Sequence, residues 1–260
     1  MTATVSLDIS GALARVTLSH SGKFNAMSRA MWRALRSVFE TVQQDQDVRC
    51  VLISGKGGHF CAGGDISEYA GFRFAEASLR DFHENDVWGG LQAIIDCDVP
   101  IVAQIEGNCM GAGLEIASCC DIRMAGASAR FGAPIAKLGF PMAPREAALV
   151  MRAVGELTAR ELLLSAAVLD ATEMKQRGFL SSVVADSELA AAVQSCVERI
   201  GSLAPGAARL NKQAFRALAT VPPAQAATDL IANAYAYADA PEHREGVTAF
   251  IEKRSPRFGR

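Results

Sequence analysis

Residues 107–121 combine a glycine-rich turn with a carboxylate at the start of an expected helix. Gly111, Ala112 and Gly113 carry almost no side chain, so a ligand could reach the backbone N–H groups that the first turn of a helix leaves unpaired. Such N–H groups stabilise negative charge that develops on a ligand oxygen. The carboxylate of Glu115 would lie close to that oxygen, and this arrangement suits proton transfer beside an oxyanion.

A second small-residue turn, at residues 58–66, follows an expected strand that ends at Ser54. Two such turns that face each other across a pocket could offer two N–H donors to one oxygen, which is an oxyanion hole. Each turn taken alone is explained as well by a tight connection that needs positive φ. The pair of turns, with Glu115 beside one of them, favours the oxyanion hole.

Neither turn has the spacing of a nucleotide-binding loop. Residues 107–113 imitate the glycine fingerprint of dinucleotide-binding domains, which expects an acidic residue about 20 positions later at a strand end. The residue 20 positions after Glu115 is Ile135, and Asp121 comes too early. Residues 55–58 do not continue into the Gly-Lys-Ser/Thr of a P-loop.

Length, charge and hydropathy narrow the function classes. The 260 residues can form one well-buried core, as one domain or as one domain with a helical appendage. No apolar run approaches the roughly 18 residues that a membrane-spanning helix needs, and the N-terminus lacks the basic and apolar regions of a secretory signal. A formal net charge of -2 argues against a general nucleic-acid surface. We expect a cytoplasmic protein that binds neither membrane nor nucleic acid.

Cysteine and histidine spacing predicts no disulfide framework and no metal site. The chain has seven cysteines, an odd number, and Cys119 and Cys120 are adjacent within an apolar segment. Such cysteines in a cytoplasmic protein are typically small buried hydrophobes. The four histidines are scattered without the repeat of a metal-ligand set.

The hydrophobic pattern predicts an α/β chain. Strands are expected at residues 5–9, 14–18, 48–54 and 101–105, with shorter extended pieces at 121–125 and 129–131. Ser28 could cap the first helix, and a polar stretch at 67–85 precedes a helix that ends near Cys97. From Pro144 onward the pattern is almost entirely helical, with breaks at Gly155, Gly178, 205–206 and 222–223. The order strand, turn and helix would by itself suggest a doubly wound sheet.

Taken together, the motifs resemble those of the crotonase superfamily, also called the enoyl-CoA hydratase/isomerase family, over nearly the whole chain. Residues 60–66 and 107–121 resemble its two oxyanion turns, residues 23–27 its first CoA-contacting segment, and residues 249–254 its C-terminal helix. The resemblance implies an α/β fold, a crotonase-like spiral of ββα units over residues 1–200. It also implies a helical region over residues 201–260 that mediates a homotrimer or, by pairing of trimers, a homohexamer.

The resemblance further implies an acyl-CoA thioester as the ligand, so coenzyme A would arrive as part of the substrate and no separate cofactor would be needed. The backbone N–H groups of Gly64 and Ala112 would hold the thioester oxygen, and Glu115 would transfer the proton. The residues implied to contact CoA are Lys23, Ala26, Ala62, Asp65, Phe250 and Lys253. Asp65 also suits the cap of a helix that begins near Ser67.

The chain departs from the family pattern at two positions. Hydratases of the family have a second glutamate where this chain has Ile135, and some relatives that shift double bonds have a carboxylate where it has Ala143. A single carboxylate is less suited to adding water, because one group must orient the water while another handles the proton at C2. Glu115 could act alone, as in a proton shuttle between carbons, or another residue could assist it. Glu146 is the nearest spare acid, but its place after Pro144 favours a simple partner of the helix dipole.

Three functions stay open. The first is an enoyl-CoA hydratase or isomerase that works through an enolate, and the second is another CoA-thioester reaction, by a decarboxylase, a hydrolase or a ring-modifying lyase. The third is a CoA-binding protein without turnover, although Glu115 favours catalysis.

His59 suits a surface loop, and Asp121 suits the anchor of a turn. An apolar or aromatic acyl group is suggested by Phe72, Phe74, Phe82 and Trp88.

We expect slow hydration of crotonyl-CoA by this chain, because an apolar residue at position 135 keeps the pocket dry and favours proton transfer over water addition. Ile135→Glu should increase the hydration rate. Ile135→Gln should not, because glutamine has nearly the shape of glutamate but lacks the carboxylate. A spectrophotometric assay of the three proteins checks this. Hydration by the wild type at the rate of an efficient hydratase would contradict it.

Overall fold

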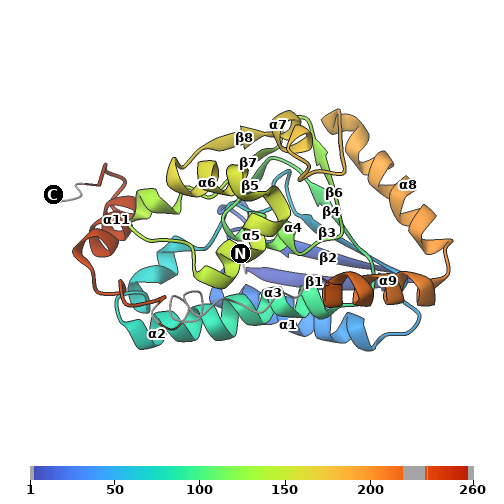
Figure 1. Ribbon diagram of the computed structural model, residues 1–260, viewed down its shortest axis with the longest axis horizontal. Coiled ribbons are helices and arrows are strands. Elements are labelled where there is room, and N and C mark those ends of the chain that lie inside the picture. Colours follow the sequence, from blue (N-terminus) through green and yellow to red (C-terminus); the bar gives the residue numbers. More distant parts are fainter. Residues whose placement is uncertain (1–2, 219–231, 233, 257–260) are drawn as a thin grey trace.

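The computed structural model describes residues 3–218, 232 and 234–256. Within them the strands form two sheets (Figure 1). The larger sheet has the order β1-β2-β3-β4-β6-β9, with strands at Thr4–Ser10, Leu13–Ser19, Cys50–Gly55, Ile101–Ile105, Ile122–Gly126 and Ser182–Val184. The smaller sheet has the order β5-β7-β8, with strands at Asn108–Met110, Arg130–Gly132 and Val168–Asp170. In the larger sheet β1 and β2 are antiparallel, and the pairs from β2 to β9 are parallel.

Helices follow most of the strands. The longer ones are α1 (Arg29–Gln44), α3 (Trp88–Asp96), α5 (Pro144–Val154), α6 (Glu156–Leu164), α8 (Leu189–Gly201), α9 (Pro205–Leu218) and α11 (Pro241–Ile251). The shorter ones are η1 (Ile66–Gly71), α2 (Glu76–Asp81), η2 (Phe82–Val87), α4 (Ala112–Ser118), η3 (Ile135–Leu138), α7 (Ala171–Gln176) and η4 (Asp186–Glu188). Of these, η2 is a π-helix, whereas η1, η3 and η4 are 3₁₀ helices.

From β4 to β7, successive strands alternate between the two sheets. β4 lies in the larger sheet and β5 in the smaller, and α4 follows them; β6 and β7 repeat this alternation before α5. Each of these two units thus adds one strand to each sheet, as in the spiral of ββα units that the resemblance implied, whereas β1 and β2 both lie in the larger sheet. The doubly wound sheet is wrong for this chain, because that fold keeps consecutive strands in one sheet.

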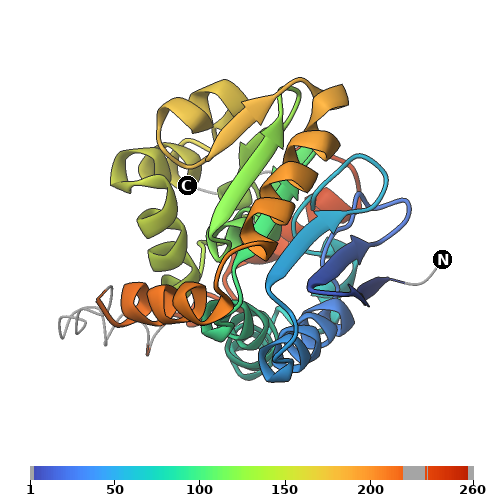
Figure 2. The same cartoon turned by 90° about the vertical axis from the view of Figure 1, so that its right-hand side faces the viewer.

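Helices cover both faces of the larger sheet. α8 crosses one face (Figure 2), where Val193 packs with Leu52 of β3 and Val102 of β4. On the other side, Leu35 of α1 and Leu91 of α3 belong to the main core. Coverage on both faces explains why β3 is a continuous apolar run, since a strand covered on one face would alternate.

Two expected helix caps are present. The Ser28 hydroxyl accepts a hydrogen bond from the Met31 N–H at the start of α1 (3.2 Å). The Asp65 carboxylate accepts one from the Ser67 N–H at the start of η1 (3.2 Å). Both side chains satisfy a backbone donor that the first turn of the helix leaves open.

The prediction of an almost entirely helical chain after Pro144 is wrong at two strands. β8 pairs with β7, where Leu169 lies opposite Phe131, and β9 pairs with β6, where Val183 lies opposite Ala125. Each of the two strands has three residues. A segment of that length is too short to show a period of two, so its partner elsewhere in the chain decides its structure.

The expected helix breaks are otherwise present. Gly155 and Gly178 have φ angles of 82° and 84° at helix ends, and Pro205 begins α9. The break expected at 222–223 lies outside the described residues. α11 packs against η1 and η3, at the end of the molecule opposite α8 (Figure 1). No helix in the described part of the chain is long and apolar enough to cross a membrane.

We expect Gly113→Ala to lower the free energy of unfolding by about 1–3 kcal/mol, as overpacking typically does. A Cβ at Gly113 would lie 2.5 Å from the backbone oxygen of Cys61, which cannot rotate away. Gly206→Ala is the matched control, because Gly206 is also the second residue of a helix but has open space around it. It should be neutral or stabilise by up to about 1 kcal/mol. Urea unfolding of both variants measures the difference, and equal effects would contradict the steric argument.

Candidate active site

The two glycine-rich turns lie side by side, as their motifs predicted. Cys61 N–H donates to the Asn108 carbonyl and Met110 N–H to the Cys61 carbonyl, both at 2.9 Å. A Cβ on Gly111 would lie 3.6 Å from the Cα of Gly63. The backbone of one turn therefore touches the backbone of the other.

Two N–H groups at this contact are open to a ligand. Gly63 and Gly111 have φ angles of 115° and 47°, a region that favours glycine. These bends leave the N–H groups of Gly64 and Ala112 without a protein acceptor among the described residues. Both residues line the same cavity.

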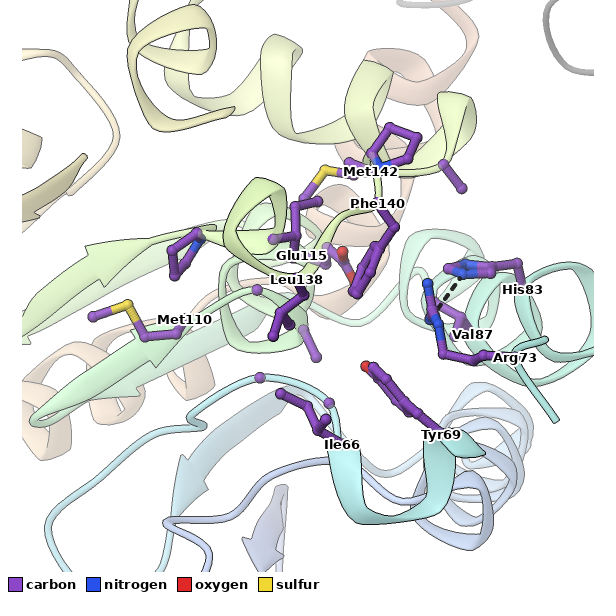
Figure 3. A pocket seen from close by; sticks show the side chains of 18 of the residues that line it. Ile66, Tyr69, Arg73, His83, Val87, Met110, Glu115, Leu138, Phe140 and Met142 are labelled. Atoms are coloured by element: carbon purple, nitrogen blue, oxygen red, sulfur yellow. Dashed lines mark hydrogen bonds between the residues drawn. The ribbon is translucent and has the colours of Figure 1, made fainter. Parts of the chain in front are cut away.

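The cavity has a volume of about 380 Å³ and a mainly apolar lining, within the range of small-molecule sites. Glu115, in the first turn of α4, points its carboxylate into this cavity (Figure 3). Burial, and after it the charge of Glu146, raise the pKa of Glu115 to about 8, although the charge of Arg73 opposes the shift. Glu115 therefore titrates close to neutral pH, which suits a group that both accepts and donates a proton.

Glu146 lies inside the protein. It stands in the first turn of α5 after Pro144, as expected, but is only 2% exposed. Its Oε1 lies 3.0 Å from Nδ1 of His83, which comes from the π-helix η2. The interpretation of Glu146 as a simple partner of the helix dipole is therefore too limited, because its charge also acts on Glu115.

Position 135, where hydratases of the family have the second glutamate, lies on the apolar side of the cavity. Ile135 lines it together with Ile66, Leu138 and Met142, and Ala143 lies at the same wall. Of the aromatic residues suggested for the acyl site, Phe82 lines the cavity and Phe72 packs behind it at 4.6 Å between ring centres. Phe74 and Trp88 are not part of the cavity lining in the described residues.

The six residues implied to contact CoA lie in several different local settings. Ala62 and Phe250 line the cavity. Ala26 is buried, and its carbonyl lies 2.7 Å from His20 Nδ1. Lys253 is exposed after the end of α11, with a φ of 55°.

Lys23 and Asp65 bind each other. The Nζ atom of Lys23 lies 2.7 Å from Asp65 Oδ2 and 2.7 Å from Ser67 Oγ. Burial alone would raise the pKa of Asp65, but the hydrogen bonds from Lys23 and Ser67, together with the charge of Lys23, outweigh it and lower that pKa. The carboxylate of Asp65 is thus satisfied within the protein, where it caps η1.

His59 and Asp121 have structural positions, as expected. His59 Nδ1 accepts a hydrogen bond from Asn108 N–H (3.1 Å), and the His59 ring lies 4.4 Å from that of Phe24. Asp121 accepts a hydrogen bond from Ile101 N–H (2.7 Å). The seven cysteines are free, and residues 3–218, 232 and 234–256 contain no group of three His, Cys, Asp or Glu side chains placed to hold a metal ion.

Sequence reasoning missed four polar residues of the cavity, Tyr69, Arg73, His83 and Lys137. Lys137 belongs to η3, and the other three come from the polar stretch at 67–85, which folds into η1, α2 and η2. A usable signal was present, since Arg73 is a single cation between Phe72 and Phe74. Such a cation in an aromatic run indicates an arginine that packs against rings.

Comparisons with known proteins agree with this geometry. The enoyl-CoA hydratase/isomerase family pattern matches residues 8–260. A probable enoyl-CoA hydratase of Mycobacterium bovis is 31% identical over 246 residues, which cover 94% of this chain and 93% of the relative. The 2,3-dehydroadipyl-CoA hydratase of Escherichia coli is 32% identical over 245 residues, with 94% and 93% covered. A crystal structure of an enoyl-CoA hydratase/carnithine racemase from Magnetospirillum magneticum has a TM-score of 0.81 at 34% identity, and covers 98% of this chain and 95% of the other. The chain belongs to the enoyl-CoA hydratase/isomerase family.

Proposed function

We propose that the chain is an acyl-CoA enzyme of the hydratase/isomerase type that converts an enoyl-CoA thioester through an enolate. The observation that carries the proposal is the position of Glu115, a single carboxylate in an apolar cavity beside the open N–H groups of Gly64 and Ala112. The names of the Mycobacterium bovis and Escherichia coli relatives, both hydratases, support an enoyl-CoA substrate.

The proposed steps use the chain's own groups. The N–H groups of Gly64 and Ala112 hold the thioester oxygen, and the Glu115 carboxylate takes a proton from C2. The electron pair of that bond moves to the oxygen, where each N–H donor stabilises the enolate by about 3 kcal/mol. Glu115 then returns the proton to C4, which moves the double bond from C3–C4 to C2–C3. This isomerisation needs one carboxylate, and Ile135 leaves one on that side of the cavity.

We also propose that residues 201–260 form the assembly surface of a homotrimer or homohexamer. Supporting this, Leu210 and Phe215 of α9 are 65% and 69% exposed in the single chain, and Phe250 and Ile251 of α11 are 54% and 48% exposed. Exposed large apolar side chains on a surface helix commonly mark a protein contact. The six residues that the resemblance implies, Lys23, Ala26, Ala62, Asp65, Phe250 and Lys253, remain proposed contacts of CoA.

Glu115→Gln should lower turnover of a 3-enoyl-CoA by about 10²–10⁴-fold, the usual contribution of a general acid or base. Acetyl-CoA binding, measured by calorimetry, should stay unchanged, because the amide keeps the shape of the side chain. Full activity in Glu115→Gln would contradict the assigned role. Acetyl-CoA binding by a wild type that turns over no enoyl-CoA would instead indicate a CoA-binding protein without turnover.

Glu115 should also make stability depend on pH. Its pKa is about 8 in the folded state against 4.5 ordinarily, so between these values the folded state holds a proton that the unfolded state has released. Stability then falls as pH rises through this window, by at most roughly 1.4 kcal/mol per pH unit. Glu115→Gln removes this loss, so its melting temperature should exceed that of the wild type by more at pH 8 than at pH 5. The same change at the exposed Glu188 should give no such trend; a constant difference for Glu115→Gln would show that the carboxylate titrates normally.

A further inference from the structure

Arg73 is a buried cation on the wall of the cavity. It is 1% exposed, lies between η1 and α2, and points toward the cavity together with Tyr69 and His83 (Figure 3). Its guanidinium carbon lies 4.4 Å from the centre of the Tyr69 ring and 3.9 Å from that of Phe140. A guanidinium stays charged in proteins, so this positive charge is held out of water and needs strong acceptors.

The bonded partners of Arg73 are neutral and distant. Nε and Nη1 each lie 3.4 Å from an imidazole nitrogen, of His243 and His83 respectively, and Nη2 lies 3.3 Å from the Tyr237 hydroxyl. Among the residues that the structure describes, no carboxylate forms an ion pair with Arg73. By contrast, Arg29 pairs with two aspartates at 2.6 and 2.8 Å.

Neighbouring titratable groups do not neutralise this charge directly. Burial and the charge of Arg73 both lower the pKa values of His83 and His243, and that of His243 falls to about 4. Both imidazoles are therefore neutral at pH 7. Glu115, with its pKa raised to about 8, is mostly protonated there. The ring of His83 bridges Arg73 and Glu146, so the two do not bond to each other.

The hydrogen-bond count of Arg73 leaves a specific pair of donors. A guanidinium has five N–H groups, and the three bonds use one on each nitrogen. One N–H remains on each terminal nitrogen, and a guanidinium can bind the two oxygens of a carboxylate through one N–H on each of two nitrogens. We propose that Arg73 binds a free carboxylate on the acyl group, so that the substrate class is a dicarboxylic acid bound to CoA through one thioester. This assignment rests on the proposed function, which supplies the thioester end of the ligand.

Tyr69 indicates that the acyl group is short. A side chain on Gly64 would overlap the Tyr69 hydroxyl, so that hydroxyl lies at the oxyanion turn, while Arg73 faces the ring of the same residue. One tyrosine ring thus lies between the turn, which would hold the thioester oxygen, and the guanidinium, which would hold the carboxylate. An acyl group that reaches both is therefore short. The hydroxyl has no hydrogen-bond partner in the described part of the chain and offers the ligand a further donor.

The test compares paired ligands that differ only at the end of the acyl group. Succinyl-, glutaryl- and adipyl-CoA carry the carboxylate, and butyryl-, pentanoyl- and hexanoyl-CoA carry a methyl group in its place. Calorimetry with the wild type should show at least one pair in which the carboxylate form binds about tenfold tighter or more, as a charge-assisted bidentate contact predicts. The shorter pairs should show the larger ratio.

Variants then assign this preference to Arg73. Arg73→Met should remove the preference while the methyl-ended ligands still bind, and Arg73→Lys should reduce it, because an ammonium lacks the paired donors. Arg145→Met is the matched control: it removes a nearby cation that already pairs with Glu84 at 2.7 Å and lies outside the cavity lining. It should leave the preference intact, even though it changes the net charge equally.

The outcomes separate this inference from the proposed function. Equal binding of both forms in every pair would overturn the carboxylate site and leave the proposed function standing. A preference that persists in Arg73→Met, even with a lowered melting temperature, would show that Arg73 is only structural. Failure of all six ligands to bind would overturn the proposed function itself. If Arg73→Met does not fold, the wild-type ratio and Arg73→Lys still decide the question.

Discussion

The contact between Gly113 and the backbone of Cys61 is the constraint on which the site depends. A glycine at the second position of α4 lets the helix rest directly on the other turn, where a Cβ would lie 2.5 Å from a carbonyl oxygen. Because of this approach, the open N–H groups of Gly64 and Ala112 line one cavity, and Glu115 faces the same space. A larger residue at position 113 would push α4 outward and separate the N–H groups of Gly64 and Ala112. The site thus depends on a glycine that itself contributes no group to the ligand.

The burial of Glu115 in this cavity sets the protonation of its carboxyl group. In a dry site the neutral form of a carboxyl group is favoured, and the charge of Glu146 adds to this effect for Glu115. Arg73 acts in the opposite sense and limits the shift. The resulting pKa near 8 lies close to the working pH of most enzymes, where a carboxyl group exchanges protons most effectively. The buried carboxyl group of Glu115 thus lowers the stability of the folded state near neutral pH, but it is able to exchange protons there.

Patterns that are local in the sequence predicted their structures well. The cap at Ser28, the two turns and the position of Glu115 each depend on a few adjacent residues, and the structure has them. The strands β8 and β9 and the residues around Arg73 depend on partners far along the chain. Arg73 bonds to His243, 170 residues later, and the hydrophobic periodicity of neither segment predicts that contact. The spiral itself came from the family resemblance, since the order of elements alone favoured the wrong sheet.

The cavity has one apolar wall and one polar wall, and this division bears on the missing glutamate. Ile135, Leu138 and Met142 form the apolar wall, so no second acid there can orient a water molecule. Glu146 keeps a negative charge nearby, but its carboxylate is held by His83 and lies outside the cavity lining in the described residues. A charge in that place raises the pKa of Glu115 without offering a site to the attacking water. Under the proposed function, the chain thus lacks the glutamate at position 135 that would orient water. It has the charge of Glu146, which raises the pKa of Glu115 and so suits it to transfer a proton between carbons.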